Sequence, residues 1–265
     1  MKASMPFGQY VPVDSPVHRL EARAKMGIVA AFTTLLFATG GFAGLAIAAG
    51  FTAVGIAVSR VPVRLALRGL KAISFLLVFT LAAHALRWNP ATVTLFRIGP
   101  LGVDGPGLLT GAYFASRVVL LVAGTSLLTL TTSPVELTDG LERLMRPLGR
   151  IGIPVGELAM MLTIALRFIP TTAEEAEKIV MAQAARGAKF DSGGPVRRAR
   201  AYVPVLVPLF VGLFRRADEL ATAMESRCYH GGPHRTRLRI SELTATDWNA
   251  MVLIGGTMVA LGIWL

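Results

Sequence analysis

A long stretch without a charged residue, from Gly27 to Ser59, restricts the possible folds of this chain more than any other feature. A helix that spans a bilayer needs about 20 predominantly apolar residues, so this stretch is too long for one span. The sequence Thr39-Gly40-Gly41 lies within it, and paired glycines favour a turn. We therefore predict two short or tilted membrane helices that are joined by a tight turn at these residues.

The composition supports a membrane protein. Of all residues 53% are hydrophobic and only 16% are charged, whereas about a quarter of the residues of a soluble domain are charged. The net charge of +11 would also suit a nucleic-acid-binding protein, but membrane proteins collect Lys and Arg in their cytoplasmic loops. We therefore expect no nucleic-acid partner. Residues 1–26 are polar and lack the apolar core of a cleavable signal peptide.

Three further apolar segments predict more spans, at about Ala72 to Leu86, Leu108 to Leu130 and Trp248 to Leu265. The segment from Arg60 to Lys71, which precedes the first of these three, has the pattern of an amphipathic helix. The residues from Arg87 to Gly107 contain three Asn-Pro or Gly-Pro pairs and are predicted to form a loop. The fold class is therefore an all-α integral membrane protein with about five transmembrane helices.

Charge predicts the orientation. If the N-terminus is cytoplasmic, only Arg87 and Arg97 fall in the predicted outside loop, as the positive-inside bias requires. Arg117 lies within the fourth predicted span, where an ionisable residue is costly and often functional. That span contains no carboxylate to pair with it. A functional role and a structural pairing with polar groups of neighbouring helices are both open.

The segment from Thr131 to Thr246 differs from the rest. Its apolar stretches, Val155 to Ile169 and Tyr202 to Phe214, are interrupted by prolines or followed by charge, so neither is typical of a membrane span. The sequence Thr172-Ala173-Glu174-Glu175 predicts a helix start of the capping-box type. We expect a large helical unit at the cytoplasmic face of the membrane, half embedded and half exposed.

Two arginines lie near the ends of predicted helices in this segment. Arg186 is followed at once by Gly187, the residue type most often found just past a helix C-terminus. Arg227 lies near the end of a long helix that is predicted to begin at about Ala201. Each arginine either balances the helix dipole, an effect worth under about 1 kcal/mol at an exposed site, or is held at a helix tip to meet a partner. The residues alone leave both possibilities open.

Several motifs resemble one known family, in the same order along the chain. They are the run from Gly8 to Lys25, the segment Thr132–Leu137, and Leu166–Pro170 followed by Glu174-Glu175 and by Gln183–Gly187. Together they resemble the transmembrane T component of energy-coupling factor transporters, a subunit of ATP-driven importers. In that family two Ala-Arg-Gly-type motifs end two coupling helices, which lie in grooves of a pair of ATPase subunits.

The resemblance implies the site. Its first motif matches Ala185, Arg186 and Gly187, and its second matches Ser226, Arg227 and Cys228. The second motif departs from the family pattern, because cysteine stands where a close-packing glycine is usual. This departure puts the fine geometry of the second motif in question more than its role. The planar guanidinium of arginine suits the bidentate recognition of a carboxylate.

The resemblance also implies the organisation and the partners. It implies a transmembrane coupling subunit of an ATP-driven micronutrient importer in the ABC superfamily, located in a prokaryotic cell membrane. Its partners would be two ABC-type ATPase subunits, an S component that binds the substrate within the membrane, and the lipid bilayer. The expected parts are a cytoplasmic N-terminal segment at 1–26, four transmembrane helices at 27–130, a cytoplasmic coupling-helix domain at 131–246 and a last transmembrane helix at 247–265.

Other functions are less well supported by the sequence. No phosphate-binding Gly-x-x-x-x-Gly-Lys motif is present, and the four histidines do not show metal-ligand spacing. We therefore expect no catalytic residue, no metal and no cofactor in this chain. The predicted spans lack Asp and Glu, which argues against a proton-coupled carrier. Two alternatives stay open, namely a dedicated cobalt, nickel or biotin system and, in a different class, a membrane carrier or enzyme that acts alone.

Overall fold

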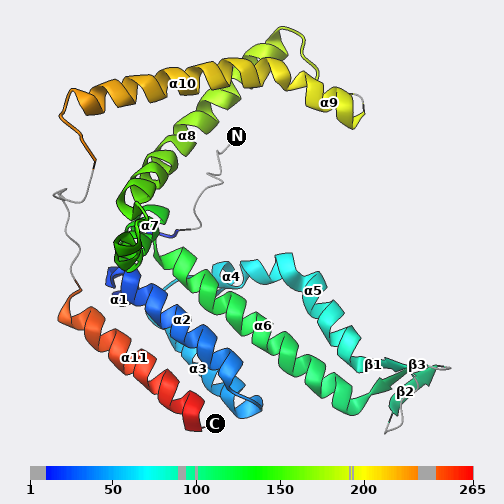
Figure 1. Ribbon diagram of the computed structural model, residues 1–265. Coiled ribbons are helices and arrows are strands. Elements are labelled where there is room, and N and C mark those ends of the chain that lie inside the picture. Colours follow the sequence, from blue (N-terminus) through cyan, green and yellow to red (C-terminus); the bar gives the residue numbers. More distant parts are fainter. Residues whose placement is uncertain are drawn as a thin grey trace. The chain divides into compact units, whose positions relative to one another are not determined.

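A computed structural model describes residues 10–88, 94–98, 101–190, 192, 194–231 and 243–264 of the chain (Figure 1). The chain divides into two compact units. The bundle unit comprises Gly8–Leu141 and Arg239–Leu265, and the crossed-helix unit comprises Glu142–Leu238. Each unit is described separately below.

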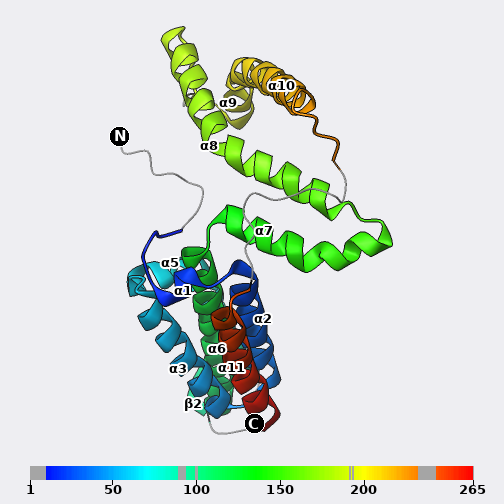
Figure 2. The same cartoon turned by 90° about the vertical axis from the view of Figure 1, so that its left-hand side faces the viewer.

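The bundle unit is built from helices whose apolar faces pack on one another. Its helices are α1 (Pro16–Arg19), α2 (Ala22–Ala38), α3 (Phe42–Ser59), α4 (Val63–Ala66), α5 (Arg68–Ala85), α6 (Gly105–Thr131) and α11 (Ala245–Trp264). Helix α5 packs on α6 and α11 packs on α2, and Figure 2 shows α2, α3, α6 and α11 running alongside one another. Helix α7 (Pro134–Met145) lies at the boundary between the units.

The core of the bundle lies between α2, α3 and α11. It contains Leu36 and Phe32 of α2 together with Leu45 of α3 and Met258 of α11, and all four are less than a tenth exposed. Close approach is needed where α6 passes α2, because a Cβ atom added at Gly124 would lie 2.5 Å from the ring of Phe32. Apolar surface that is removed from water stabilises a fold by about 25 cal/mol per Å². Around a membrane bundle, bilayer lipid takes the place of water.

The predicted turn in the first apolar stretch is confirmed. Helix α2 ends at Ala38 and α3 begins at Phe42. The N–H and the hydroxyl of Thr39 both donate to the carbonyl of Leu35, at 3.0 and 2.9 Å. Gly41 then adopts a φ of +106°, which favours glycine.

Two predictions for the segment after α3 are wrong in part. The amphipathic stretch that begins at Arg60 is not one helix, because Arg60 adopts a left-handed φ of 56° and Pro62 follows it before the short helix α4. The predicted loop from Arg87 to Gly107 instead carries a three-stranded antiparallel sheet of β1 (Leu86–Trp88), β2 (Thr94–Ile98) and β3 (Leu101–Asp104), in the order β1-β3-β2. Apolar and β-branched residues favour these strands.

The proline pairs in that loop have different outcomes. Asn89-Pro90 and the pair at 99–100 fall on residues that lie outside the described ones. Gly105-Pro106 opens helix α6, where a proline in the first turn sacrifices no intrahelical hydrogen bond. The third pair is therefore a helix start.

The crossed-helix unit holds the 3₁₀ helix η1 (Arg146–Ile151), α8 (Val155–Ala185), α9 (Pro195–Ala201) and α10 (Val203–Glu225). Helices α8 and α10 are in contact, and Figure 1 shows them crossing. Helix α8 is continuous through Pro170, so the predicted helix start at Thr172 is wrong. A proline costs about 3 kcal/mol inside a helix, but Arg216 of α10 contacts both Phe168 before it and Glu175 after it. These tertiary contacts favour one continuous helix.

The all-α membrane class is confirmed. Among the described residues, four helices are long and apolar enough to cross a bilayer, namely α3, α5, α6 and α8. The first three correspond to predicted spans, whereas α8 lies in the segment that the sequence places at the cytoplasmic face. The number and identity of the spans therefore stay a prediction.

Candidate functional site: two arginine-tipped helix ends

The first candidate motif lies where α8 ends. The backbone N–H of Gly187 donates to the carbonyl of Ala184 at 2.9 Å, and the N–H of Ala188 donates to that of Gln183 at 3.0 Å. This pair of bonds is a Schellman-type helix ending, which needs a left-handed residue between the last helical turn and the departing chain. Gly187 supplies it with a φ of +91°. Arg186 is thereby held as the last residue before the chain turns away.

The second motif has the same hydrogen-bond pattern at the end of α10. The N–H of Cys228 donates to the carbonyl of Glu225 at 2.9 Å, and the N–H of Tyr229 donates to that of Met224 at 3.0 Å. Cys228 adopts the left-handed conformation, with a φ of 56°. Arg227 therefore occupies the same place in its helix ending as the first arginine does in its own. The loss of glycine leaves the geometry of the second tip intact.

Non-glycine residues pay an energetic penalty in the left-handed region. The close approach of Cβ to the carbonyl oxygen costs roughly 1–2 kcal/mol for an ordinary residue. Cys228 is one of two described residues other than glycine with a positive φ, and the other is Arg60. An unfavourable conformation that the surrounding structure maintains is often found at a functional position.

All six candidate residues are exposed. Within the described ranges of the chain, neither the Arg186 nor the Arg227 guanidinium donates a hydrogen bond or forms an ion pair. Each side chain presents five N–H donors to a partner. Two exposed, always-charged forks at matching helix ends are well suited to bind carboxylates on another protein.

The second tip is also attached to α8. The hydroxyl of Tyr229 contacts the sulfur of Met160 at 2.8 Å. This contact links the residue after the second motif to the N-terminal half of α8. Met160 therefore makes a contact within the crossed-helix unit.

Arg117 forms the structural pairing with polar groups of neighbouring helices that the sequence left open. Its guanidinium donates to the carbonyl of Thr39 at 2.8 Å and also to the hydroxyl of Tyr113. It lies 4.8 Å from the centre of the Tyr113 ring and 5.5 Å from that of Phe37. A cation is favourable at a helix C-terminus and over aromatic faces. Arg117 thus holds the turn between α2 and α3 against α6.

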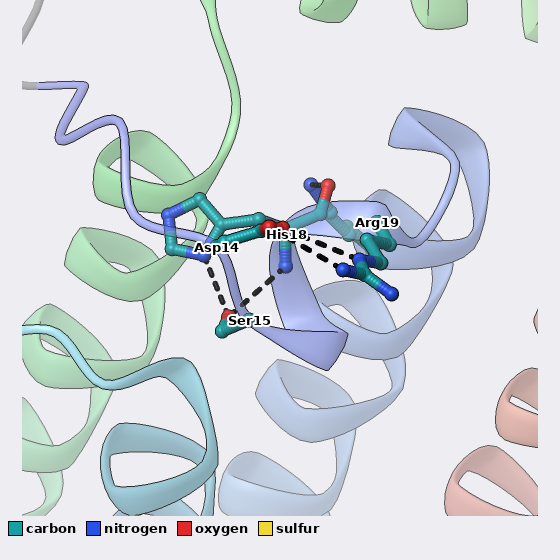
Figure 3. A network of polar contacts seen from close by, with 5 residues as sticks. Asp14, Ser15, His18 and Arg19 are labelled. Carbon is teal, nitrogen blue, oxygen red and sulfur yellow. Dashed lines mark hydrogen bonds and ion pairs between the residues drawn. The ribbon is translucent and has the colours of Figure 1, made fainter.

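The N-terminal segment contains a polar network that sequence reasoning missed (Figure 3). The hydroxyl of Ser15 accepts from the backbone N–H of His18 at 3.3 Å and lies 2.7 Å from its Nδ1, while His18 Nε2 lies 3.0 Å from the carbonyl of Val11. Arg19 pairs with Asp14 at 3.3 Å, but both side chains are exposed. The sequence contained a signal for this helix start, because Ser is favoured at the N-cap and Pro at the first helical position.

A second missed feature is two buried charged side chains near the start of α2, Asp247 of α11 and Lys25 of α2. The carboxylate of Asp247 accepts the backbone N–H groups of Glu21 and Thr244, each at 2.9 Å. Lys25 is 5% exposed and donates to the carbonyls of Thr131 at 2.9 Å and His18 at 3.1 Å. The sequence Thr-x-x-Asp is a capping-box pattern that could have predicted the start of α11.

The environment shifts the pKa values of both groups. Burial would raise the pKa of Asp247, but hydrogen bonds from the Thr244 hydroxyl and from the two backbone N–H groups outweigh it, so the pKa lies below its usual value. Burial lowers the pKa of Lys25, and the nearby carboxylates of Glu136 and Asp247 oppose that shift. In the described part of the chain, no group of three or more His, Cys, Asp or Glu residues could hold a metal ion.

Comparison with known proteins gives a consistent family. A family model described as cobalt transport protein, CbiQ, matches residues 14–238. The energy-coupling factor transporter transmembrane protein EcfT of Heliobacterium modesticaldum is 47% identical over 264 residues, covering 100% of this chain and 98% of its own. The proteins of the same name from Thermosediminibacter oceani and Bacillus subtilis are 46% and 44% identical, over 97% and 95% of this chain and 98% and 95% of their own.

Proposed function

Because this chain belongs to the family of CbiQ and EcfT transporter membrane proteins, we propose that it is the transmembrane coupling subunit, or T component, of an ATP-driven importer of the energy-coupling factor type. The observation that carries the proposal is the pair of exposed arginines in matching helix endings. Such a subunit transmits the motion of ATPase subunits to a separate S component that binds the substrate in the membrane.

The arginine tips are the proposed contacts with two ABC-type ATPase subunits. Because the helix ending holds the backbone of each arginine, the backbone loses little conformational freedom on binding. The guanidinium can form two parallel hydrogen bonds with one carboxylate. Ala185 and Ser226 precede the two arginines and have small side chains, so both tips are narrow enough to enter a groove. Gly187 and Cys228 turn the chain away behind each arginine.

The chain itself is not the ATPase in this proposal. Its sequence contains no phosphate-binding Gly-x-x-x-x-Gly-Lys motif. Binding and hydrolysis of ATP therefore belong to the partner subunits, and the chain has a mechanical role without catalytic residues. This argument also weighs against a membrane enzyme or carrier that acts alone.

The proposed location is a prokaryotic cell membrane, with the N-terminus in the cytoplasm. The distribution of Lys and Arg supports this orientation, because it leaves the segments at 1–26 and 131–246 on the cytoplasmic side. The proposed coupling-helix domain at 131–246 contains both arginine tips. Hydropathy alone would also allow α8 to cross the membrane, but Glu174, Glu175 and Lys178 lie in its C-terminal half, where a membrane position would be costly.

Two alternatives stay open for the substrate. The relatives named EcfT favour a module of the energy-coupling factor type that several S components share. The description of the family model as a cobalt transport protein favours a dedicated metal system. Copurification of the full complex, followed by identification of every S component in it, distinguishes a shared module from a dedicated cobalt, nickel or biotin system.

The docking role is tested by charge reversal. We expect the double variant Arg186→Glu with Arg227→Glu to insert into the membrane normally but to lose substrate uptake, because a like-charge contact in place of an attractive one costs several kcal/mol. Single variants should be affected less, since two tips share the contact. The measurements are uptake and ATPase copurification at matched expression.

Arg215→Glu is the matched control, because Arg215 is exposed on α10 but lies away from the tip. It should leave uptake and copurification unchanged. Normal uptake with normal copurification in the double variant would remove the two arginines from the proposed site.

A further inference from the structure

The two arginine tips extend from a crossing of α8 and α10 that contains one interhelical ion pair. Glu175 of α8 accepts a hydrogen bond from Arg216 of α10, with 2.8 Å between Oε2 and Nη2. About a third of each side chain is exposed, at 32% and 33%. This contrasts with the pair of Arg19 and Asp14, whose side chains are 76% and 82% exposed. A solvent-exposed pair contributes little, whereas partial burial strengthens the attraction and makes the loss of one partner costly.

Two further residues shape the crossing around this pair. The guanidinium of Arg216 lies 5.7 Å from the centre of the Phe168 ring. On α10, Gly212 leaves room for the carboxylate, because a Cβ atom added there would lie 2.9 Å from Oε1 of Glu175. Gly212 and Arg216 are four residues apart and Phe168 and Glu175 are seven apart, so each pair lies on one face of its helix. The crossing is therefore a specific contact with matching shape and charge.

The pair has the same position relative to both tips. Glu175 precedes Arg186 by the same eleven residues by which Arg216 precedes Arg227. Eleven residues make about three helical turns and about 16 Å. Two arms of equal length therefore run from the ion pair to the two arginines, and each arginine lies on nearly the same side of its helix as the paired residue.

We propose that Glu175 and Arg216 are a positioning pair that sets the crossing point of α8 and α10 and thereby fixes the separation of the two arginine tips. The proposal rests on the proposed function, in which both arginines bind ATPase subunits at once. Binding at two sites gains from a linkage only when its geometry matches the distance between them. A shift of the crossing along either helix would lengthen one arm, shorten the other and misplace one arginine.

The separation of the tips can be measured directly in the purified full-length chain, without the ATPase subunits. Cys228 is the only cysteine and directly follows Arg227, so a single Lys189→Cys change provides a second spin-label site three residues after Arg186. The measurement is the distribution of distances between the two labels by pulsed electron resonance in nanodiscs. We expect a narrow distribution in the parent chain and a broader or shifted one after Glu175→Gln or Arg216→Gln.

The chain offers matched controls one residue away on each helix. Glu174 and Arg215 are exposed neighbours of the pair, so Glu174→Gln and Arg215→Gln remove the same charges from the same helices and should leave the distribution unchanged. The exchange of both charges, Glu175→Arg with Arg216→Glu, should restore a narrow distribution. Gly212→Ala should broaden it without any change of charge, because the added methyl group displaces the carboxylate.

The contact of Tyr229 with Met160 also links α10 to α8, so each variant is measured with and without Tyr229→Phe. The broadening should be greater when this contact is removed. In the complete transporter, Glu175→Gln should reduce uptake several-fold while the ATPase subunits still copurify, and the charge exchange should recover uptake.

Distributions for Glu175→Gln and Arg216→Gln that match those of the controls in both backgrounds would overturn the positioning role. This outcome is independent of the docking test. If the double reversal of Arg186 and Arg227 leaves uptake normal while the distance distributions change as expected, the proposed docking function fails and the positioning pair stands.

Discussion

At the scale of single residues, the two tips show how different side chains support one backbone geometry. Gly187 and Cys228 both adopt a left-handed conformation, and both are followed by the same backward hydrogen bond. Glycine does this without a steric penalty. Cysteine does so only because the last turn of α10 and the contact of Tyr229 hold the chain in place. Cys228 therefore adopts a backbone conformation that its residue type disfavours.

That disfavoured conformation predicts the effect of restoring glycine. Cys228→Gly should stabilise the end of α10 by up to about 1 kcal/mol, because relief of the steric penalty exceeds the entropy that glycine adds to the unfolded chain. The measurement is hydrogen exchange of the Tyr229 amide, which should become slower. Gly187→Ala is the reciprocal variant, and it should speed the exchange of the Ala188 amide. Equal exchange rates in the parent and Cys228→Gly chains would show that the left-handed cysteine is not strained.

At the scale of elements, the bundle unit depends on contacts between helix starts that lie far apart in the sequence. Asp247 accepts an N–H from Glu21, the residue that precedes α2, and caps its own helix α11 through Thr244. One carboxylate thus accepts from N–H groups at two helix starts, which have no partner within their own helices, and negative charge there is also favoured by the helix dipoles. This contact fixes the start of α11 beside the start of α2, and the two helices pack on each other.

The Asp247 carboxylate predicts a dependence of stability on pH. Its pKa is lower in the folded chain than in the unfolded chain, so its stabilising contribution is present above the unfolded value, near pH 4, and is lost as the pH falls through the folded value. We expect α11 to loosen from α2 in acid, which hydrogen exchange of the Glu21 amide and the emission of the neighbouring Trp248 would report.

The corresponding variant removes the charge at neutral pH. Asp247→Asn should cost about 1–3 kcal/mol, because one buried donor loses a charged acceptor, and it should flatten the acid dependence. Asp139→Asn is the control, since Asp139 is exposed on α7 of the same unit. If the acid transition is unchanged in Asp247→Asn, other carboxylates cause that transition.

At the scale of the whole molecule, the chain combines a helical bundle with a unit built around two crossing helices. In the bundle unit, α3, α5 and α6 are long and apolar enough to cross a bilayer. The crossed-helix unit carries charged tips at its helix ends and large exposed apolar side chains along α10, among them Phe210, Val211 and Phe214. A mixture of this kind is typical of a surface that meets both membrane and protein partners.

The proposed orientation is tested by labelling single cysteines in intact cells, in a Cys228→Gly background. Ser192→Cys lies in the proposed cytoplasmic domain and should react only after the membrane is permeabilised. Leu86→Cys lies next to the predicted outside loop, where Leu86 is 49% exposed, and should react with an impermeant reagent added outside. The reverse pattern at either position would contradict the orientation.

Much of the fold and of the candidate site followed from local signals in the sequence. The charge-free stretch and the pair of glycines predicted α2, α3 and the turn between them, because bilayer thickness and glycine conformation act within a few residues. The ends of α8 and α10 were predicted close to where the structure has them, since an arginine after small residues is a local signal at both ends and a following glycine adds to it at the end of α8. The six motif residues were chosen through a family resemblance, and their docking role stays a proposal.

The sequence by itself thus determined the membrane class, the main helices of the bundle and the endings of the two long helices, because hydropathy and helix termination depend on neighbours along the chain. Only the tertiary structure decided that α8 continues through Pro170, that Asp247 joins α11 to α2, and that Glu175 meets Arg216. Each of these depends on a partner that lies tens to hundreds of residues away. Local preference cannot predict such contacts, because the partner residues are not neighbours along the chain.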